Sequence, residues 1–217
     1  MCIRDRSNLA SANLDTIGVR IPNNITALKL IKSFGKPIAA PSANTSSSLS
    51  PTEANHVYEY FKNDKNLSII LDGGSTQIGL ESTIINLNND KIEILRHGGV
   101  SAEELKEKFP EKVINIEQKD SEIIIAPGML SKHYSPAVPL RINAKKAEKN
   151  ELLIGFGPNY NAPNLSFDGS LVEAASNLFS FLAKYQKKYS KIAIAPIPNN
   201  GIGRAINDRI KRATSKN

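Results

Sequence analysis

The sequence has one cysteine and no long hydrophobic run, and each of these features excludes a class of protein. A single Cys cannot form an internal disulfide, which excludes a disulfide-stapled secreted domain. The longest apolar runs, such as 121–127, have the length of a strand and fall short of the ~20 residues of a transmembrane helix. Residues 1–6 contain no apolar stretch typical of a secretory signal. We therefore expect a cytoplasmic protein without a membrane span.

The proportions of hydrophobic and charged residues are average for a folded protein. Of the 217 residues, 40% are hydrophobic and 23% are charged, which excludes collagen-like and largely disordered chains. At about 150 residues per domain, this length predicts one large domain or two small ones. The net charge of +7 favours phosphate-bearing partners, either nucleotide or nucleic acid. An ordinary lysine-rich surface would give the same charge, since much of the excess lies in 204–216.

The first half of the chain alternates strand-like runs with helical patterns. Apolar runs predict strands at 16–21, 36–41 and 67–74, a helix at 24–34 and a hairpin of strands 82–87 and 91–96. Asn23 or Asn24 should cap the helix, and Gly35 should end it. Two capping boxes predict further helix starts, one at 50–53 and one at 101–104, and the second helix should end at Pro110.

The second half of the chain begins with a stretch in which proline is frequent and periodicity weakens. We interpret 111–150 as a linker. Beyond it, the pattern predicts a strand at 152–157, an amphipathic helix at 170–185, a strand at 191–195 and a basic helix after Gly201. This order is typical of a small α/β unit. We therefore expect an α/β protein with a catalytic segment at 1–110, the linker at 111–150 and a small domain at 151–217.

Four polar loops that follow strand-like runs are the candidates for chemistry; they span 41–48, 79–83, 96–99 and 126–136. The hydroxyl and amide groups of the first loop suit phosphate or carboxylate oxygens. Arg96, beside two glycines, could bind a phosphate with its bidentate guanidinium, and Glu81 could act as a base only in a desolvated setting. Each loop alone is also compatible with a surface turn, which is the more common role of a loop such as 41–48, and Tyr134 is also compatible with a packed structural residue.

Other common chemistries have little support in the sequence. The phosphate-binding patterns GxxxxGK[ST] and GxGxxG are absent, and Gly201-Ile202-Gly203 is only a fragment of the second. The three His residues lie far apart without the spacing of metal ligands, and Cys2 lies in the opening hexapeptide. We therefore assign no metal site and no catalytic nucleophile.

Taken in order, the loops resemble those of the threonylcarbamoyl-AMP synthase family over nearly the whole chain after residue 14. The stretch at 201–209 and the linker motifs are similar to the long, two-domain form of the family and not to its single-domain YrdC-type form. The residues that carry the resemblance are Thr16-x-x-x-Arg20, Ala39-Ala40-Pro41-Ser42-Ala43-Asn44, Ser50-Pro51-Thr52, Asp72-Gly73-Gly74, Gly79-Leu80-Glu81-Ser82-Thr83, Leu95-Arg96-His97-Gly98-Gly99, Pro127-Gly128-Met129 and His133-Tyr134-Ser135-Pro136.

The resemblance implies an α/β fold made of part of a YrdC-like twisted open sheet with helices, a linker that closes over the active site and a small Rossmann-like domain. It implies a nucleotidyltransferase, L-threonylcarbamoyladenylate synthase, which forms threonylcarbamoyl-AMP and pyrophosphate from L-threonine, bicarbonate and ATP. The product serves the N6-threonylcarbamoylation of adenosine 37 in tRNA. Mg²⁺ is expected with ATP, and no tightly bound cofactor is expected.

The resemblance also implies a role for individual residues. Those that would bind L-threonine are Arg20, Ser42 and Ser82. Those that would bind ATP are Thr16, Asn44, Thr52, Arg96 and Tyr134, with Arg96 on the phosphates and Tyr134 covering the nucleotide. No catalytic residue is implied, because the mechanism consists of positioning and charge neutralisation.

The sequence departs from the family pattern in three places. Ser47 replaces the usual Gly, and His97 replaces the usual Pro. The third departure is larger, because the N-terminal part of the catalytic domain, with the KxR half of the family's signature, is missing and the pattern begins near Asn13. Residues 1–6 match nothing in the family and are expected to be non-native. We therefore predict that this polypeptide alone is inactive and partly unfolded in its first segment, where strands lose their neighbours.

Two other functions remain as alternatives. A non-catalytic YrdC-like module that binds RNA, double-stranded RNA included, would suit the charge of +7. The aromatic content of 6% and the lack of aromatic-rich strands weigh against it. A carbamoyl-transfer domain from hydrogenase maturation is disfavoured by the motif at 133–136 and by the stretch at 201–209.

Overall fold

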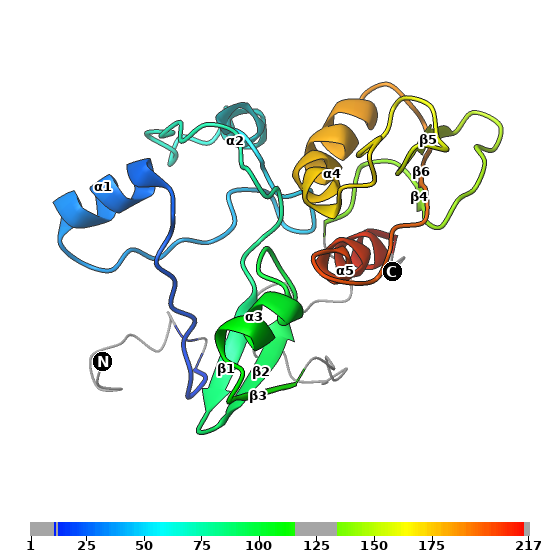
Figure 1. The fold of residues 1–217 in the computed structure, drawn as a ribbon. Helices are drawn as coiled ribbons and strands as arrows, with labels where there is room; N and C mark the ends of the chain where they lie inside the picture. The colour runs from blue at the N-terminus through cyan, green and yellow to red at the C-terminus, as the bar shows by residue number, and fades with distance from the viewer. Residues whose placement is uncertain (1–10, 12, 116–133, 215–217) are drawn as a thin grey trace.

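The computed structural model describes residues 11, 13–115 and 134–214, which form two lobes (Figure 1). The first lobe comprises 13–115 and the second comprises 134–214. Each contains a three-stranded sheet and helices, so the α/β class predicted from the sequence is confirmed. Among these residues, no helix combines the length and the apolar character needed to cross a membrane.

The sheet of the first lobe has the strand order β1-β2-β3. Strands β1 (Ile84–Asn88) and β2 (Lys91–Arg96) form the predicted antiparallel hairpin, and β3 (Val113–Asn115) pairs parallel with β2. Helix α3 (Ala102–Lys108) packs on this sheet through Leu105, which lies in a small apolar cluster with Ile94. Its predicted capping box is confirmed, because Ser101 accepts from the Glu104 amide and Glu104 accepts from the Ser101 amide.

Helices α1 (Ile25–Phe34) and α2 (Ala54–Phe61) complete the first lobe. Helix α1 is as predicted: the Asn24 side chain accepts from the Ala27 amide, and Gly35 ends the helix in the left-handed conformation with φ 70°. The capping box predicted at 50–53 is wrong. Glu53 precedes α2 without a side-chain cap, because Ser50 donates its hydroxyl to a partner 31 residues away.

The strands predicted at 16–21, 36–41 and 67–74 are absent from the structure. Val19, Ile21 and Ile69 are 76%, 86% and 73% exposed. Strand-like composition alone does not produce a strand, because a strand requires a neighbour for its backbone hydrogen bonds and for its side chains. These segments pair with no strand among the described residues.

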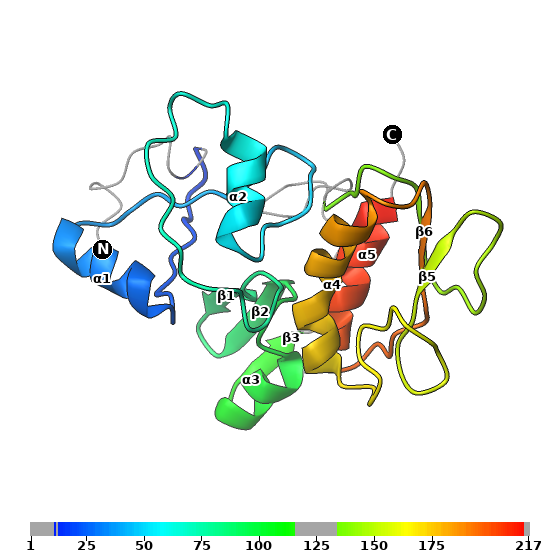
Figure 2. The same ribbon diagram turned by 90° about the horizontal axis from the view of Figure 1, so that it is seen from above.

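The second lobe has a parallel sheet with the order β4-β6-β5. Its strands are β4 (Leu140–Arg141), β5 (Leu152–Ile154) and β6 (Ile192–Ile194). Helix α4 (Leu171–Tyr185), the amphipathic helix predicted at 170–185, is capped by Ser170 and connects β5 to β6, and α5 (Gly203–Thr214) follows β6. Both helices lie between the two sheets (Figure 1, Figure 2), so that α4 and α5 form the contact between the lobes.

Two strands lie inside the segment 111–150 that the sequence predicts to be a linker. Strand β3 belongs to the first sheet and β4 to the second. The predicted motifs at 127–129 and His133 fall outside the described residues, as do the expected non-native residues 1–6.

The main core lies under α4 and α5 and includes two residues from outside the small domain. Leu178, Ile192 and Ile206 are fully buried, which stabilises the lobe by about 1.5–3 kcal/mol per side chain. Leu49 of the first lobe and Tyr134 belong to the same cluster. The loop at 42–50 is therefore anchored in the core of the second lobe.

Candidate functional site

The predicted loop 79–83 runs along the surface of the second lobe at close range. Gly79 has a φ of 71°, and a Cβ on it would lie 2.4 Å from the Ala175 carbonyl oxygen of α4. Only glycine fits this left-handed backbone against a helix. The close contact determines where the next two residues, Glu81 and Ser82, are placed.

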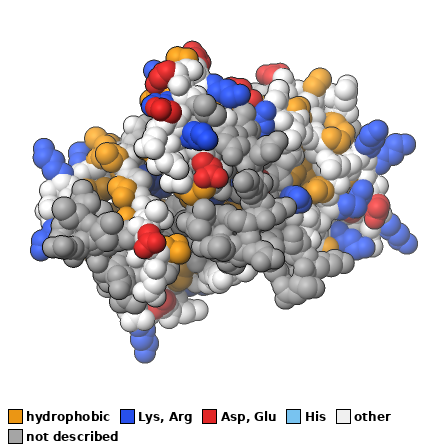
Figure 3. All heavy atoms as spheres, turned by 90° about the horizontal axis from the view of Figure 1, so that it is seen from below, with side chains coloured by type: hydrophobic (Ala, Val, Ile, Leu, Met, Phe, Trp, Pro, Cys, Tyr) orange, Lys and Arg blue, Asp and Glu red, His pale blue; other side chains and the backbone are white. Residues whose placement is uncertain are grey.

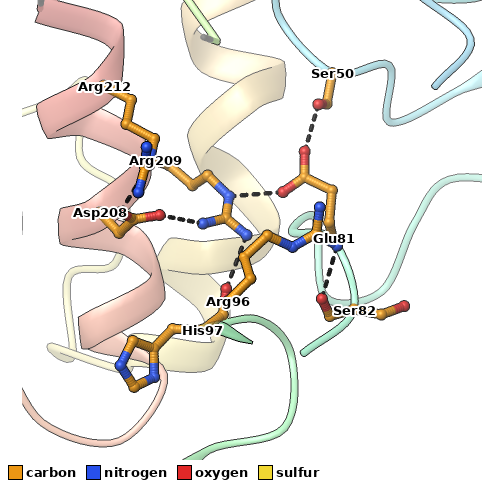
Figure 4. Close-up of polar contacts among 8 residues, drawn as sticks. All are labelled: Ser50, Glu81, Ser82, Arg96, His97, Asp208, Arg209 and Arg212. Carbon is orange, nitrogen blue, oxygen red and sulfur yellow. Dashed lines mark hydrogen bonds and ion pairs between the residues drawn. The ribbon is translucent and has the colours of Figure 1, made fainter. Parts of the chain in front are cut away.

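Glu81 lies between the two lobes, with one carboxylate oxygen on each side (Figure 4). Oε1 accepts the hydroxyl proton of Ser50, and Oε2 accepts from Nε of Arg209 at 2.7 Å. Arg209 lies on α5, so the pair joins this loop to the C-terminal helix. The geometry makes Glu81 a structural acceptor and leaves it poorly suited to act as a general base.

Arg209 has a side chain with 0% exposure, and its charge is satisfied on all sides. Besides Glu81, it donates from Nη2 to the His97 carbonyl oxygen at 2.8 Å and from Nη1 to the Asp208 carboxylate. The ring of Tyr134 lies 5.0 Å from its Cζ, within the range of a cation–π contact. A buried guanidinium is stable only with such partners.

The electrostatic environment keeps Glu81, Arg209 and Arg96 ionised. Burial alone would raise the pKa of Glu81, but the charge of Arg209 and the hydrogen bonds from Ser50 and Arg209 lower it below its usual value. Burial would lower the pKa of Arg209, but the nearby charge of Glu81 raises it. Burial and the charge of Arg209 lower the pKa of Arg96, which nonetheless stays a cation.

Three of the residues predicted to bind substrate meet at Ser82. Arg20 donates from Nη1 to Ser82 Oγ at 3.4 Å, across 62 residues of sequence. Arg96, only 8% exposed, donates from Nη2 to the Ser82 carbonyl oxygen at 2.8 Å. Two guanidinium groups and a hydroxyl thus surround one short loop, an arrangement suited to a carboxylate and a phosphate.

Gly98 lies on the other side of the same loop. A Cβ on Gly98 would lie 2.3–2.4 Å from backbone atoms of Glu81, Ser82 and Thr83. The Gly99 amide donates to the Glu81 carbonyl oxygen at 3.1 Å, which fixes the crossing of the two chains. Gly98 is therefore required by close packing of backbone on backbone, whereas a Cβ on Gly99 would meet only the Ile78 side chain, at 3.1 Å.

The loop at 42–52 brings two of the predicted ATP-binding residues into buried positions. Asn44 is 9% exposed and donates from Nδ2 to the carbonyl oxygens of Thr45 and Ser48, while its Oδ1 has no hydrogen-bond partner among the described residues. Thr52 is 6% exposed, with its hydroxyl 3.3 Å from Nδ1 of His56. A buried acceptor without a donor is costly, and a ligand can supply that donor.

The remaining predicted residues are placed differently. Thr16 and Ser42 are exposed. Tyr134 is 1% exposed, and its ring lies 5.6 Å from that of Phe179 in the core of the second lobe. Burial raises the pKa of its phenol. The amide of the next residue, Ser135, donates to the Ser47 carbonyl oxygen, so this segment borders the loop that contains Asn44.

Sequence reasoning missed the role of Arg209, Asp208 and Ser50. The sequence predicts a basic helix after Gly201 without a role for Arg209, and the pattern at Ser50 indicates a helix cap. A cation on the apolar face of a helix was the available signal, since Arg209 lies between Ile206 and Ile210 in a buried stripe. Its acidic partner 128 residues earlier could not be identified from spacing.

A cavity beside α5 is lined in part by His97 and Asp208, two of the residues that contact Arg209. Its lining contains none of the residues predicted to bind substrate; the residues that line it are His97, Ile142, Asn143, Ile197, Asn199, Arg204, Asn207, Asp208 and Lys211. The candidate site is therefore the group of loops around Ser82 and Asn44, next to the contact between the lobes.

Two family profiles match the chain in succession. One, described as "Telomere recombination", matches residues 3–98, and the other, described as "Threonylcarbamoyl-AMP synthase, C-terminal domain", matches residues 100–215. The first match begins ahead of Asn13, where the sequence pattern had suggested that the resemblance starts.

Curated relatives have the same order of segments. Over 94% of this chain, the identity is 34% to threonylcarbamoyl-AMP synthase of Pyrococcus abyssi and 33% to that of Bacillus subtilis. The matches span 65% and 64% of those two proteins, so the chain corresponds to slightly less than two thirds of their length.

Solved structures agree in fold. The crystal structure of P. abyssi Sua5 complexed with L-threonine superposes with a TM-score of 0.82 at 32% identity, over 96% of this chain and 66% of that one. The structure of a double variant of P. abyssi Sua5 superposes with a TM-score of 0.79 at 33% identity. The match covers 96% of this chain and 65% of that one. The predicted architecture, a partial YrdC-like sheet followed by a small α/β domain, is confirmed.

Proposed function

Because this chain belongs to the threonylcarbamoyl-AMP synthase family, we propose that it contributes substrate loops to an L-threonylcarbamoyladenylate synthase. The reaction joins L-threonine, bicarbonate and ATP into threonylcarbamoyl-AMP and releases pyrophosphate. The threonylcarbamoyl group is then destined for an adenosine of tRNA. The proposal includes the cytoplasmic location expected from the composition.

The observation that carries the proposal is the convergence of Arg20 and Arg96 on Ser82. The Arg20 guanidinium is exposed and suits the carboxylate of L-threonine, while the Ser82 hydroxyl can bond the substrate's polar groups. The solved archaeal relative was complexed with L-threonine. Arg96, next to this pair, would then face the phosphates of ATP.

The chemistry that follows requires positioning more than proton transfer. The threonine amine forms a bond to the bicarbonate carbon, and a C–O bond of bicarbonate breaks so that its hydroxyl leaves with an amine proton as water, which gives a carbamate. A carbamate oxygen then forms a bond to the α-phosphorus of ATP. The bond between the α-phosphorus and the bridging oxygen breaks, and pyrophosphate leaves with that electron pair. Arg96 would hold the phosphates in place and offset the developing charge.

Mg²⁺ would enter this scheme together with ATP. Among the described residues, no three His, Cys, Asp or Glu side chains gather as they do at a protein metal site. Magnesium is commonly held by substrate phosphates with one or two protein oxygens, and the Asn44 Oδ1 is an oxygen of the right kind. The ion would supply charge neutralisation at the phosphates.

Calorimetric titration of the 217-residue chain with L-threonine and with ATP tests the proposal. Saturable binding of both is expected, and Arg20→Ala should weaken threonine binding at least about tenfold while leaving ATP binding unchanged. The matched control is Arg141→Ala, which removes a half-buried guanidinium that pairs with Glu151 in the second lobe.

Two results would overturn this function. One is the absence of threonine binding at any concentration, accompanied by RNA binding, which would favour a non-catalytic module. The other is an equal loss of threonine affinity in the Arg20→Ala and Arg141→Ala variants. The expectation that the chain alone releases no pyrophosphate stays a prediction, which a threonine-dependent pyrophosphate assay addresses.

A further inference from the structure

The net positive charge of this protein comes from residues 141–217, most of which form the second lobe. Residues 141–217 contain 13 Lys and Arg against 5 Asp and Glu, whereas residues 1–140 contain 15 against 16. From 174 to 207 there is no acidic residue at all. The positive potential therefore belongs to the small domain and not to the substrate loops of the first lobe.

Four lysines of this domain lie close together at one turn. Helix α4 ends at Tyr185, and the chain turns back into β6 within a few residues. The exposed lysines of this turn are Lys184, Lys187, Lys188 and Lys191. Together with Tyr189 they form what we call the lysine surface.

Aromatic rings lie among these lysines. Tyr189 is 41% exposed, and its ring centroid lies 6.1 Å from that of Tyr185. Tyr185 in turn contacts Phe181 at 5.7 Å, and the Lys184 ammonium lies 5.3 Å from the Tyr185 centroid. Tyr189 is thus an exposed ring with an edge contact to the half-buried ring of Tyr185, which in turn has an edge contact to the half-buried ring of Phe181.

A second set of lysines borders this surface. The Leu152 amide donates to the Lys191 carbonyl oxygen, and the Ser190 hydroxyl to the Asn150 carbonyl oxygen, so the loop before β5 lies beside the turn. That loop exposes Lys145, Lys146 and Lys149. Figure 3 shows Lys and Arg side chains gathered at the end of the molecule where β4, β5 and β6 lie.

The acidic residues of that loop offset only a small part of the lysine charge, because Glu148 and Glu151 carry two negative charges and Arg141, which contacts both, carries one positive charge. Glu151 accepts two hydrogen bonds from Arg141, and Glu148 lies 3.4 Å from the same guanidinium. The lysines that surround them carry a net positive charge toward solvent.

We propose that the lysine surface binds RNA, with its ammonium groups on the phosphates and the ring of Tyr189 stacked on an unpaired base. Lysines at several adjacent positions suit the repeating charge of a phosphate backbone, and exposed rings among them provide base stacking. The choice of RNA over other polyanions rests on the proposed function, whose product is destined for tRNA.

Fluorescence anisotropy with a fluorescein-labelled RNA hairpin tests the proposal on the full chain. Binding should weaken steeply between about 50 and 200 mM salt. The quadruple variant Lys184→Gln, Lys187→Gln, Lys188→Gln and Lys191→Gln should bind at least about tenfold more weakly and reduce the salt slope by about 3 to 4. Tyr189→Ala should weaken binding at least about fivefold with an unchanged slope, and Tyr189→Phe should restore it.

A matched control neutralises four exposed lysines of the first lobe, namely Lys29, Lys32, Lys36 and Lys65. It should retain the affinity and salt slope of the wild type. Three results would overturn the proposal. The two quadruple variants could lose RNA affinity equally, the lysine-surface variant could bind RNA as tightly as the wild type, or the wild type could fail to bind RNA. Equally tight binding to vesicles that contain phosphatidylserine would also overturn it.

Titration of L-threonine and ATP into the lysine-surface variant separates this inference from the proposed function. Both ligands should bind as they do to the wild type, because the surface lies on the second lobe, away from Ser82. If neither ligand binds to either protein while the RNA result holds, the proposed function fails and the RNA surface remains.

Discussion

Nε of Arg209 on helix α5 lies 2.7 Å from Oε2 of Glu81, 128 residues earlier in the chain, and this pair joins the two lobes beside the candidate site. Glu81 is followed directly by Ser82, on which Arg20 and Arg96 converge. The C-terminal helix therefore positions the loop that we assign to substrate, and the two lobes act as one unit at this point.

Substituting Arg209 tests how much this contact stabilises the fold. Arg209→Met should lower the free energy of unfolding by about 3 kcal/mol, because it leaves the partly buried Glu81 carboxylate without its cation. Urea denaturation followed by circular dichroism measures the change. Lys62→Met, which removes an exposed i,i+3 pair with Glu59, should cost less than about 0.5 kcal/mol. Equal costs would mean that the buried pair contributes no more than a surface pair.

The lowered pKa of Glu81 predicts a dependence of stability on pH. The unfolded carboxyl titrates near 4.5, and the folded one lies lower, so its contribution is fully present above 4.5 and is lost as pH falls through the folded value. The free energy of unfolding should fall on acidification through this range, and Glu81→Gln should flatten that fall. Urea denaturation at a series of pH values below about 6 measures it.

Glu107→Gln provides the control for the pH series, since this residue is exposed on α3. It should retain the wild-type profile. If Glu81→Gln retained that profile as well, Glu81 would contribute nothing to the acid sensitivity of the fold.

Features that depend on neighbouring residues were predictable from the sequence, whereas contacts between distant residues were not. The cap of α1 at Asn24 and the capping box of α3 at Ser101 were predictable, because each depends on residues within one turn. Ser50 carried the same capping signal, yet its hydroxyl bonds Glu81. Nothing within 50–53 distinguishes the two outcomes, since the competing acceptor lies 31 residues away.

The candidate site was predictable only as a set of motifs. Arg20, Ser82 and Arg96 were assigned through the family resemblance, and the structure brings them together. The role of Arg209 was not predictable, because an ion pair between lobes depends on how α5 packs. The prediction of strands at 16–21, 36–41 and 67–74 is wrong for a similar reason. Composition indicates a tendency to form a strand, but whether a strand forms depends on pairing with a neighbouring strand.

The crossing of two chains at Gly98 predicts a severe effect of the smallest substitution. Gly98→Ala would place its Cβ 2.3 Å from the Glu81 carbonyl oxygen, and neither backbone can move without displacing Ser82. We expect a loss of about 3 kcal/mol or more in the free energy of unfolding, together with a loss of threonine binding. Thermal denaturation and calorimetry measure the two effects.

Gly18→Ala is the matched control for that substitution. A Cβ on Gly18 would have no heavy atom within 4 Å. The free energy of unfolding of Gly18→Ala should differ from that of the wild type by less than about 1 kcal/mol. A similar tolerance at Gly98 would mean that the crossing is looser than the structure shows.

Asn44 contains a buried acceptor that a nucleotide can satisfy. Its Nδ2 already bonds two loop carbonyl oxygens, whereas Oδ1 has no partner among the described residues. Asn44→Ala should weaken ATP binding at least about tenfold, because a bonded buried acceptor is lost. Thr45→Ala, which removes the exposed hydroxyl bond to Ser48 in the same loop, should change ATP affinity less than about twofold. Calorimetric titration compares the two, and equal losses would assign the effect to the loop's conformation instead of to Oδ1.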